Sequence, residues 1–176
     1  MKQSRIRLLA FFLTILAACF AAAQDIQVSP TKGGVVIVLS ADKPYQLLPG
    51  EEKTATLSMQ CLHVKNKSSH ILLFSPGGAV AEDDPETTSK HGGVGLMMTI
   101  GGKKQRTSWI SYNDPDTYAY FGKTEPERVE FYDSLFKYDS ASIDFKPFLT
   151  GVENTSVFNI GKLREEMAKY PECSMR

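Results

Sequence analysis

The pattern of apolar and polar residues predicts two strands, joined by a turn, in the last third of the chain. Apolar positions alternate with polar ones through Ile143, Phe145 and Phe148, as on a strand with one buried face. A turn at residues 150–151 then leads to a short strand at 156–158. We therefore expect these two strands to form part of a sheet close to the C-terminus.

Two helices are predicted, both late in the chain. The first, residues 124–137, opens with Thr124 and Glu127, whose spacing is that of a capping box, and continues with one apolar stripe. The second, residues 161–170, has apolar side chains every three or four positions, and Pro171 ends it. Each helix thus has one face to bury against a sheet.

Antiparallel strands account for most of the remaining pattern. Two runs on either side of a polar turn, 55–61 and 70–74, predict a hairpin. Runs rich in β-branched and aromatic residues mark further strands at 35–39, 94–100, 106–112 and 117–121. Together the elements predict an α+β fold, with an antiparallel β-sandwich-like sheet of seven or eight strands and two helices near the C-terminus.

Residues 1–23 have the pattern of a secretory signal peptide. Three basic residues precede an apolar stretch too short to span a bilayer, and Ala21–Ala23 offers a small-residue cleavage site. Lipidation is the competing interpretation, because residues 16–19 also fit the bacterial lipoprotein pattern, in which Cys19 is acylated and becomes the new N-terminus. Removal of the signal leaves residues 24–176, which have the length of a single exported domain.

The charge balance excludes one class of partner. The chain has 20 Lys and Arg against 20 Asp and Glu, and the signal peptide carries three of the basic residues and none of the acidic ones. The exported chain therefore has 17 basic against 20 acidic residues, a formal charge of −3. A nucleic-acid-binding protein would need a basic face, so we expect no nucleic-acid partner.

Two cysteines remain in either form of the exported chain, because Cys19 is removed or acylated. In an oxidising compartment an even pair is expected to bridge, so we predict a disulfide between Cys61 and Cys173. This disulfide would tie the C-terminal helix to a strand of the sheet. We expect the protein in the periplasm, either soluble or lipid-anchored to a membrane.

Three segments, 131–135, 142–148 and 156–163, followed by Cys173, resemble the C-terminal half of the VasI-type periplasmic proteins associated with type VI secretion. Invasion-associated locus B proteins show a weaker likeness over the same ending. The run that ends at Cys61 is similar to the strand that the family's terminal cysteine bridges. The resemblance implies an accessory of a secretion or invasion system, and it supplies no catalytic residues. The chain departs from the family by lacking its N-terminal cysteine-containing region and by carrying an extra acidic loop.

The sequence offers few groups for catalysis or metal binding. His63 and His70 face each other across the predicted hairpin, but no Cys or His spacing supplies the further ligands of a zinc site. Asp114 and Asp116 would suit a small carboxylate-based hydrolase, yet turn chemistry already explains them. The sequence has no Gly-x-Ser-x-Gly, His-Glu-x-x-His or phosphate-binding loop motif, so we expect neither an enzyme nor a cofactor.

Two features favour protein binding instead. Residues 75–93 are predicted to form an acidic loop, in which Asp83, Asp84 and Glu86 would face a basic partner. The aromatic set between residues 106 and 121 is larger than a sheet core requires, and aromatic side chains are favoured at interfaces. Its partner-contact candidates are Trp109, Tyr112, Tyr118 and Tyr120, for which plain sheet packing is the alternative.

These observations predict an exported non-catalytic envelope protein that binds another envelope or secreted protein, as an accessory of a secretion or invasion system. The alternative among binding proteins is a periplasmic immunity or inhibitor protein that blocks an effector or a cell-wall enzyme. The alternative of another class is the carboxylate-based hydrolase.

Overall fold

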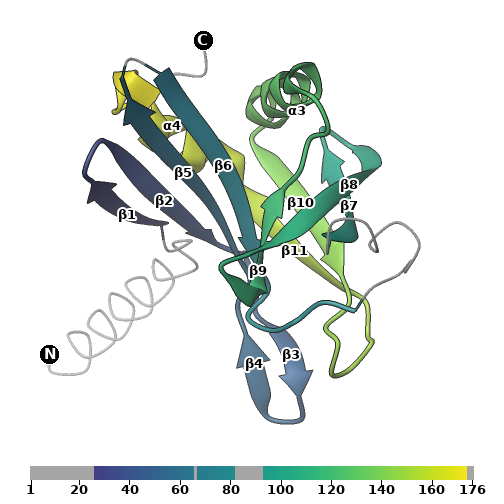
Figure 1. The fold of residues 1–176 in the computed structure, drawn as a ribbon. Coiled ribbons are helices and arrows are strands. Elements are labelled where there is room, and N and C mark those ends of the chain that lie inside the picture. Colours follow the sequence, from purple (N-terminus) through teal and green to yellow (C-terminus); the bar gives the residue numbers. More distant parts are fainter. Residues whose placement is uncertain (1–25, 66, 82–92, 174–176) are drawn as a thin grey trace, which may run out of the picture.

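The computed structural model describes residues 26–65, 67–81 and 93–173 (Figure 1). Within these ranges nine strands form one antiparallel sheet, and two more form a separate hairpin. In spatial order the sheet contains β1 (Ile26–Thr31), β2 (Gly34–Ser40), β5 (Thr56–Val64), β6 (Lys67–Ser75), β9 (Asp114–Tyr120), β8 (Lys103–Tyr112), β7 (Gly93–Ile100), β10 (Ser140–Phe145) and β11 (Asn154–Asn159). The other elements are the hairpin of β3 (Tyr45–Leu48) and β4 (Glu51–Lys53), the helices α3 (Glu125–Lys137) and α4 (Ile160–Met167), and the short 3-10 helix η1 (Pro171–Cys173). The predicted α+β antiparallel class is confirmed, whereas the signal peptide and Cys19 lie outside the described residues.

The sheet has more strands than the seven or eight predicted, and β1 shows why. It pairs with β2 along its whole length, from Ile26 opposite Leu39 to Thr31 opposite Gly34. Its side chains are mostly exposed, so it has no buried face to generate an alternating apolar pattern. Pro30 cannot donate a backbone hydrogen bond, and it is tolerated because β1 lies at the edge of the sheet.

One continuous sheet curves round the core, so that its two halves face each other (Figure 1). The ring of Phe74 on β6 lies 5.3 Å from that of Phe145 on β10 and 6.3 Å from that of Phe158 on β11, measured between centroids. Past the end of β2, the backbone N–H of Asp42 donates to the carbonyl of Val157 on β11 at 2.9 Å. The sandwich-like character therefore comes from a folded-over sheet and not from two stacked sheets.

Helix α3 begins as the sequence predicts. The side chain of Thr124 accepts from the backbone N–H of Glu127, and the side chain of Glu127 accepts from the backbone N–H of Thr124, which completes the capping box. The buried face of the helix consists of Phe131, Tyr132 and Leu135. Through Phe131, whose ring stacks on Tyr120 at a centroid distance of 3.8 Å, α3 packs against β9.

Removal of the Thr124 side chain tests how much the cap of α3 contributes to stability. The Thr124→Ala variant is expected to have a free energy of unfolding lower by about 1 kcal/mol, because one helix-terminal N–H loses its acceptor. Urea denaturation followed by circular dichroism measures the change. Ser134→Ala, in the same helix but away from its N-terminus, serves as the control and is expected to cost nothing, because alanine is the better helix former. Equal losses in the two variants would contradict the role of the cap.

The predicted disulfide joins the C-terminal segment to the sheet. Cys61 on β5 bonds to Cys173 in η1, with a Cα–Cα distance of 5.8 Å, and both residues are fully buried. Helix α4 ends at Met167, earlier than the predicted residue 170, and η1 continues the chain to the cysteine. Asn159 caps α4 by accepting from the backbone N–H of Lys162 at 3.0 Å. The helix thus follows β11 directly and packs near β2.

Strand β10 is shorter than predicted. It ends at Phe145, and Phe148, expected on its buried face, is 70% exposed. Pro147 lacks an N–H to continue the ladder, and its carbonyl instead accepts from the backbone N–H groups of Thr150 and Gly151, at 3.2 and 2.8 Å. Gly151 takes a positive φ of 61°, which confirms the predicted turn.

Candidate functional site

Two of the four aromatic contact candidates lie in the core. Trp109 is 0% exposed, and its indole N–H donates to the hydroxyl of Thr107 at 2.8 Å. Tyr118 is 5% exposed, and its hydroxyl accepts from the backbone N–H of Val80 at 2.9 Å. Because both side chains have internal hydrogen-bond partners and almost no accessible surface, packing explains them, and their assignment to a partner surface needs correction.

Tyr120 is half-buried beneath α3. Its ring stacks on Phe131, and it meets Trp109 edge to face at a centroid distance of 5.8 Å. Burial raises the pKa of Tyr120, and burial also raises the pKa of the neighbouring Tyr132 to about 12. Both phenols therefore remain neutral at physiological pH and act here as packing groups that attach the helix to the sheet.

Tyr112 is the aromatic candidate that turns to the other side of the sheet. It is half-buried near the end of β8, and its hydroxyl lies 3.5 Å from the side-chain oxygen of Gln60 on β5. The contact crosses from one part of the sheet to another that is far away in sequence. Tyr112 therefore belongs to the outward surface of the sheet, as the interface interpretation requires.

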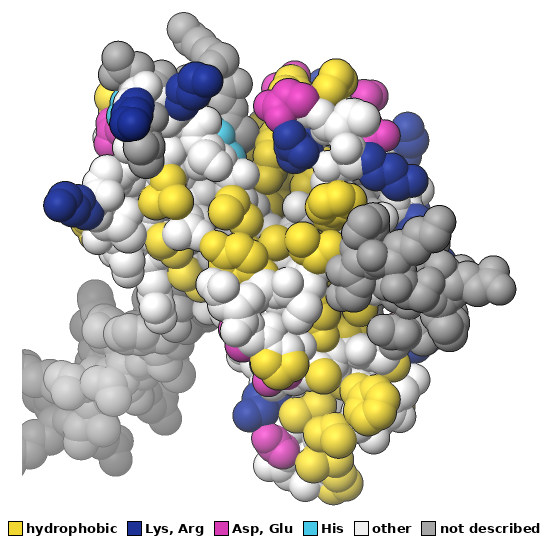
Figure 2. All heavy atoms as spheres, in the orientation of Figure 1, with side chains coloured by type: hydrophobic (Ala, Val, Ile, Leu, Met, Phe, Trp, Pro, Cys, Tyr) yellow, Lys and Arg dark blue, Asp and Glu magenta, His cyan; other side chains and the backbone are white. Residues whose placement is uncertain are grey.

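That surface, here called the outer sheet face, carries a row of uncharged residues across five strands. Register places Val38 opposite Ser58, Ser58 opposite Leu73, Leu73 opposite Ala119, and Ala119 opposite Ile110. The residues before and after Val38, Ser58 and Leu73 are buried in the core, so these three side chains lie on the opposite side of the sheet. The pairing continues this side through Ala119, which is 5% exposed, to Ile110. Figure 2 shows apolar side chains gathered over the middle of this face.

The apolar character of the outer sheet face extends beyond that row. Val36 and Ile71 both lie opposite Gln60, on either side of β5, and they are half-buried like Val38 and Leu73. The strand predicted at residues 35–39 did not reveal this surface. The available signal was the lack of alternation in 35–39 and 71–74, which indicates strands that are apolar on both faces.

A second region, the C-terminal groove, lies where η1 meets the hairpin of β5 and β6. Its volume is about 760 Å³, and its lining includes His63, Ser68, Phe136 and Met167. The hydroxyl of Ser68 donates to the backbone carbonyl of Glu172, and Nδ1 of His63 lies 3.1 Å from the same hydroxyl oxygen. Since the hydroxyl proton is directed at the carbonyl, Nδ1 of His63 must donate, and it is not placed to act as a base toward Ser68.

The other histidine of the hairpin has a structural contact as well. Nε2 of His70 donates to the carbonyl of Cys173 at 2.8 Å, next to the disulfide. Within residues 26–65, 67–81 and 93–173 no group of three or more His, Cys, Asp and Glu side chains is arranged to hold a metal ion. The two histidines thus help to fasten the C-terminal segment to the hairpin.

Asp114 and Asp116, the carboxylates considered for a hydrolase, form a turn. The side chain of Asp114 accepts from the backbone N–H of Asp116 at 2.9 Å, directly after Asn113, which takes a positive φ of 62°. This is the Asx chemistry expected of such a turn. The acidic-loop candidates Asp83, Asp84 and Glu86 lie outside the described residues.

A smaller hollow of about 400 Å³ lies between α3 and β8. Charged side chains of both signs line it, namely Lys103, Arg106, Lys123, Glu127 and Glu130. With three basic and two acidic side chains, the hollow does not collect charge of a single sign for an anionic or a cationic ligand.

Comparison of the chain with protein-family models, with curated proteins and with solved structures found no match in any of the three. In the part of the chain that the structure describes, no helix is both long enough and apolar enough to cross a membrane. Any assignment of function therefore depends on the geometry above and on the sequence pattern.

Proposed function

We propose that this chain is an exported, disulfide-stabilised protein that binds another protein of the cell envelope through its outer sheet face and catalyses no reaction. The observation that carries the proposal is the uncharged row Val38, Ser58, Leu73, Ala119 and Ile110, which runs across five strands. An antiparallel sheet that faces only water usually alternates polar outward with apolar inward, whereas β2 and β6 carry Val36, Val38, Ile71 and Leu73 on their outward side. Extended apolar surfaces of this kind mark interaction sites.

The shape and chemistry of the outer sheet face suit a protein partner. Most of its apolar side chains are half-buried among their neighbours, and Ala119 among them is buried. Tyr112 at its margin combines a large ring with a hydroxyl, a combination enriched in protein interfaces. The more specific role, as an accessory of a secretion or invasion system, is part of this proposal through the sequence resemblance alone.

Crosslinking tests the proposal. A photo-crosslinking amino acid placed at Tyr112 is expected to give a discrete adduct with one envelope protein, and the same amino acid at Val129, 49% exposed on α3, is expected to give none. The purified partner should then bind the Leu73→Asp variant at least tenfold more weakly than the unmodified protein, because a charge would be buried in the interface.

The matched control for this affinity is Val129→Asp, which adds the same charge to α3, away from the outer sheet face. Its affinity for the partner is expected to equal that of the unmodified protein. Circular dichroism and thermal unfolding verify that both variants are folded. Adducts of the same kind from both crosslinker positions, or equal affinities for the two aspartate variants, would contradict the proposal.

A further inference from the structure

Several of the most exposed apolar side chains gather at one end of the molecule, here called the apolar end. It consists of Phe148, Leu149 and Val152 in the loop between β10 and β11, and Leu48 at the turn of the β3–β4 hairpin. Their side chains are 70%, 66%, 61% and 41% exposed, respectively. Both parts lie at the bottom of Figure 1, and Figure 2 shows apolar side chains gathered over the same region.

A short segment connects these two parts physically. The backbone N–H of Phe148 donates to the carbonyl of Ala79 at 2.7 Å, and Val80 pairs with Pro147. On the other side of that segment, the hydroxyl of Tyr45 on β3 donates to the carbonyl of Pro76 at 2.6 Å. The apolar end is therefore a single structure that includes two loops distant in sequence.

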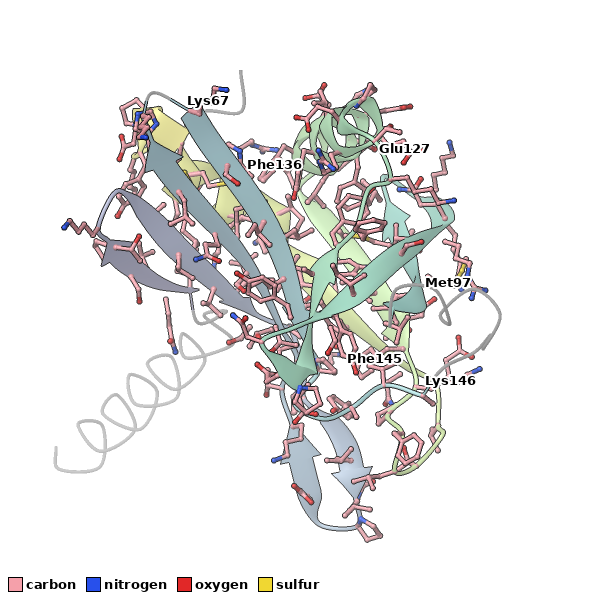
Figure 3. All side chains as sticks on the ribbon, in the orientation of Figure 1. Lys67, Met97, Glu127, Phe136, Phe145 and Lys146 are labelled. Atoms are coloured by element: carbon pink, nitrogen blue, oxygen red, sulfur yellow. A yellow bond between two sulfur atoms is a disulfide. The ribbon has the colours of Figure 1, made fainter. Side chains whose placement is uncertain are left out.

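The exposed side chains are held out by an ordered backbone. The carbonyl of Pro147 fixes the turn at residues 150–151, and the ring of Phe145, where β10 ends, packs against Tyr45 at a centroid distance of 5.1 Å. Phe145 and the adjoining Lys146 mark the place where the chain leaves the sheet (Figure 3). The backbone on both sides of Phe148 and Leu149 is therefore held by contacts with other parts of the fold while their side chains remain exposed.

The charges near the apolar end are of both signs, and the exposed Glu52 on β4 leaves one acidic residue more than the basic ones. Glu51 and Lys53 pair with each other on β4 at 3.1 Å, and Lys146 and Glu153 flank the loop on either side. A surface that recognised a charged partner would collect one sign of charge. The driving force available here is removal of apolar side chains from water, which salt does not screen.

The first described residue, Ile26, lies at the same end of the sheet. Ile26 lies opposite Leu39, near the end of β2 from which the β3–β4 hairpin continues (Figure 1). Seven residue steps separate Cys19 from Ile26, and seven separate Ala41 from Leu48. Either stretch spans at most about 25 Å. A bilayer that held an acylated Cys19 would thus be within reach of the apolar end.

From the exposed side chains, the mixed charge and the position of Ile26, we propose that the apolar end inserts into the interfacial region of a phospholipid bilayer. Loops that project Phe and Leu from a rigid sheet can enter the boundary between headgroups and acyl chains without a spanning segment. The outer sheet face lies on other residues, so a membrane-docked molecule would keep it free for a protein.

Vesicle flotation tests the proposal with the chain that begins at Gln24. The protein is expected to float with vesicles of phosphatidylethanolamine and phosphatidylglycerol, and to do so equally at low and high salt. The double variant Phe148→Ser/Leu149→Ser is expected to lose at least four-fifths of the floated fraction. Val129→Ser, which removes an exposed apolar side chain from α3, is the matched control and is expected to float like the unmodified protein.

A reporter at the same site measures insertion directly. Phe148→Trp adds a tryptophan at the apolar end, whereas Trp109 is buried and does not respond to the solvent. Vesicles should shift the added emission to the blue, and brominated lipid should quench it. Absence of flotation, or undiminished flotation of the double variant, would overturn the proposal. So would a dimer that the double variant converts to a monomer, because a second copy would then cover the apolar end.

These outcomes are independent of the proposed protein partner. Leu73→Asp lies on the outer sheet face and is expected to float like the unmodified protein. Failure of the partner experiment with normal flotation would therefore count against the proposed function alone.

Discussion

Replacement of both Cys61 and Cys173 by alanine is expected to lower the free energy of unfolding by about 4–5 kcal/mol. The two residues are 112 positions apart, so the disulfide closes a loop that includes most of the sheet. In the chain-entropy account, the bridge stabilises the fold mainly by restricting the unfolded chain, and a loop of this length gives nearly the largest effect. Alanine at two fully buried positions adds a small packing loss.

Thermal unfolding measures this loss as a fall in the midpoint of roughly 10–20 °C for a domain of this length. The control is the unmodified protein with dithiothreitol at a temperature where it is folded. Both sulfurs are fully buried, so the reductant should leave the native protein oxidised and act only after unfolding. A double variant with an unchanged midpoint, or two free thiols in the oxidised native protein, would contradict the prediction.

Besides the disulfide, two hydrogen bonds attach the C-terminal segment to the hairpin of β5 and β6. His70 donates to the carbonyl of Cys173, and Ser68 donates to that of Glu172. These bonds lie beside the C-terminal groove and depend on η1 staying in place. Without the bridge, η1 would be free to leave the hairpin, and the groove would lose one wall.

Local chemistry made several parts of this fold predictable. The capping box of Thr124 and Glu127, the turn at Gly151 and the hairpin of β5 and β6 each depend on residues close together in the sequence. The pairing of Cys61 with Cys173 was predictable for another reason, since the predicted removal or acylation of Cys19 leaves two cysteines to pair. In these cases, the structure follows from residues close together in the sequence or from the number of cysteines available to pair.

The placement of aromatic side chains was not predictable in the same way. Period-two alternation assigns Tyr118 and Tyr120 to one face, but it does not say whether α3 or another strand covers that face. Trp109 and Tyr118 are buried because the sheet folds over, and this curvature depends on contacts between β6 and β10 that no local pattern encodes. The exposure of Phe148 likewise follows from Pro147, which ends the strand earlier than the alternation suggests.

Phe74 is the residue on which the folded-over sheet depends most directly. It is 0% exposed, and its ring contacts Trp109 on β8, Phe145 on β10 and Phe158 on β11. Phe74→Ala is expected to lower the free energy of unfolding by about 3–5 kcal/mol, because it removes the ring that fills the space between the two halves. Phe74→Leu, which keeps much of the volume, is expected to cost roughly 1–2 kcal/mol.

Urea denaturation measures both variants, and Phe148→Ala provides the matched control. This substitution removes the same ring from a side chain that is 70% exposed, so the expected change is within about 0.5 kcal/mol. If Phe74→Ala lowers the free energy of unfolding by several kcal/mol more than Phe148→Ala does, the stabilising contacts are those between the two facing halves of the sheet. Equal losses of unfolding free energy would contradict packing of the two halves around Phe74, because removal of a buried ring costs more than removal of an exposed one.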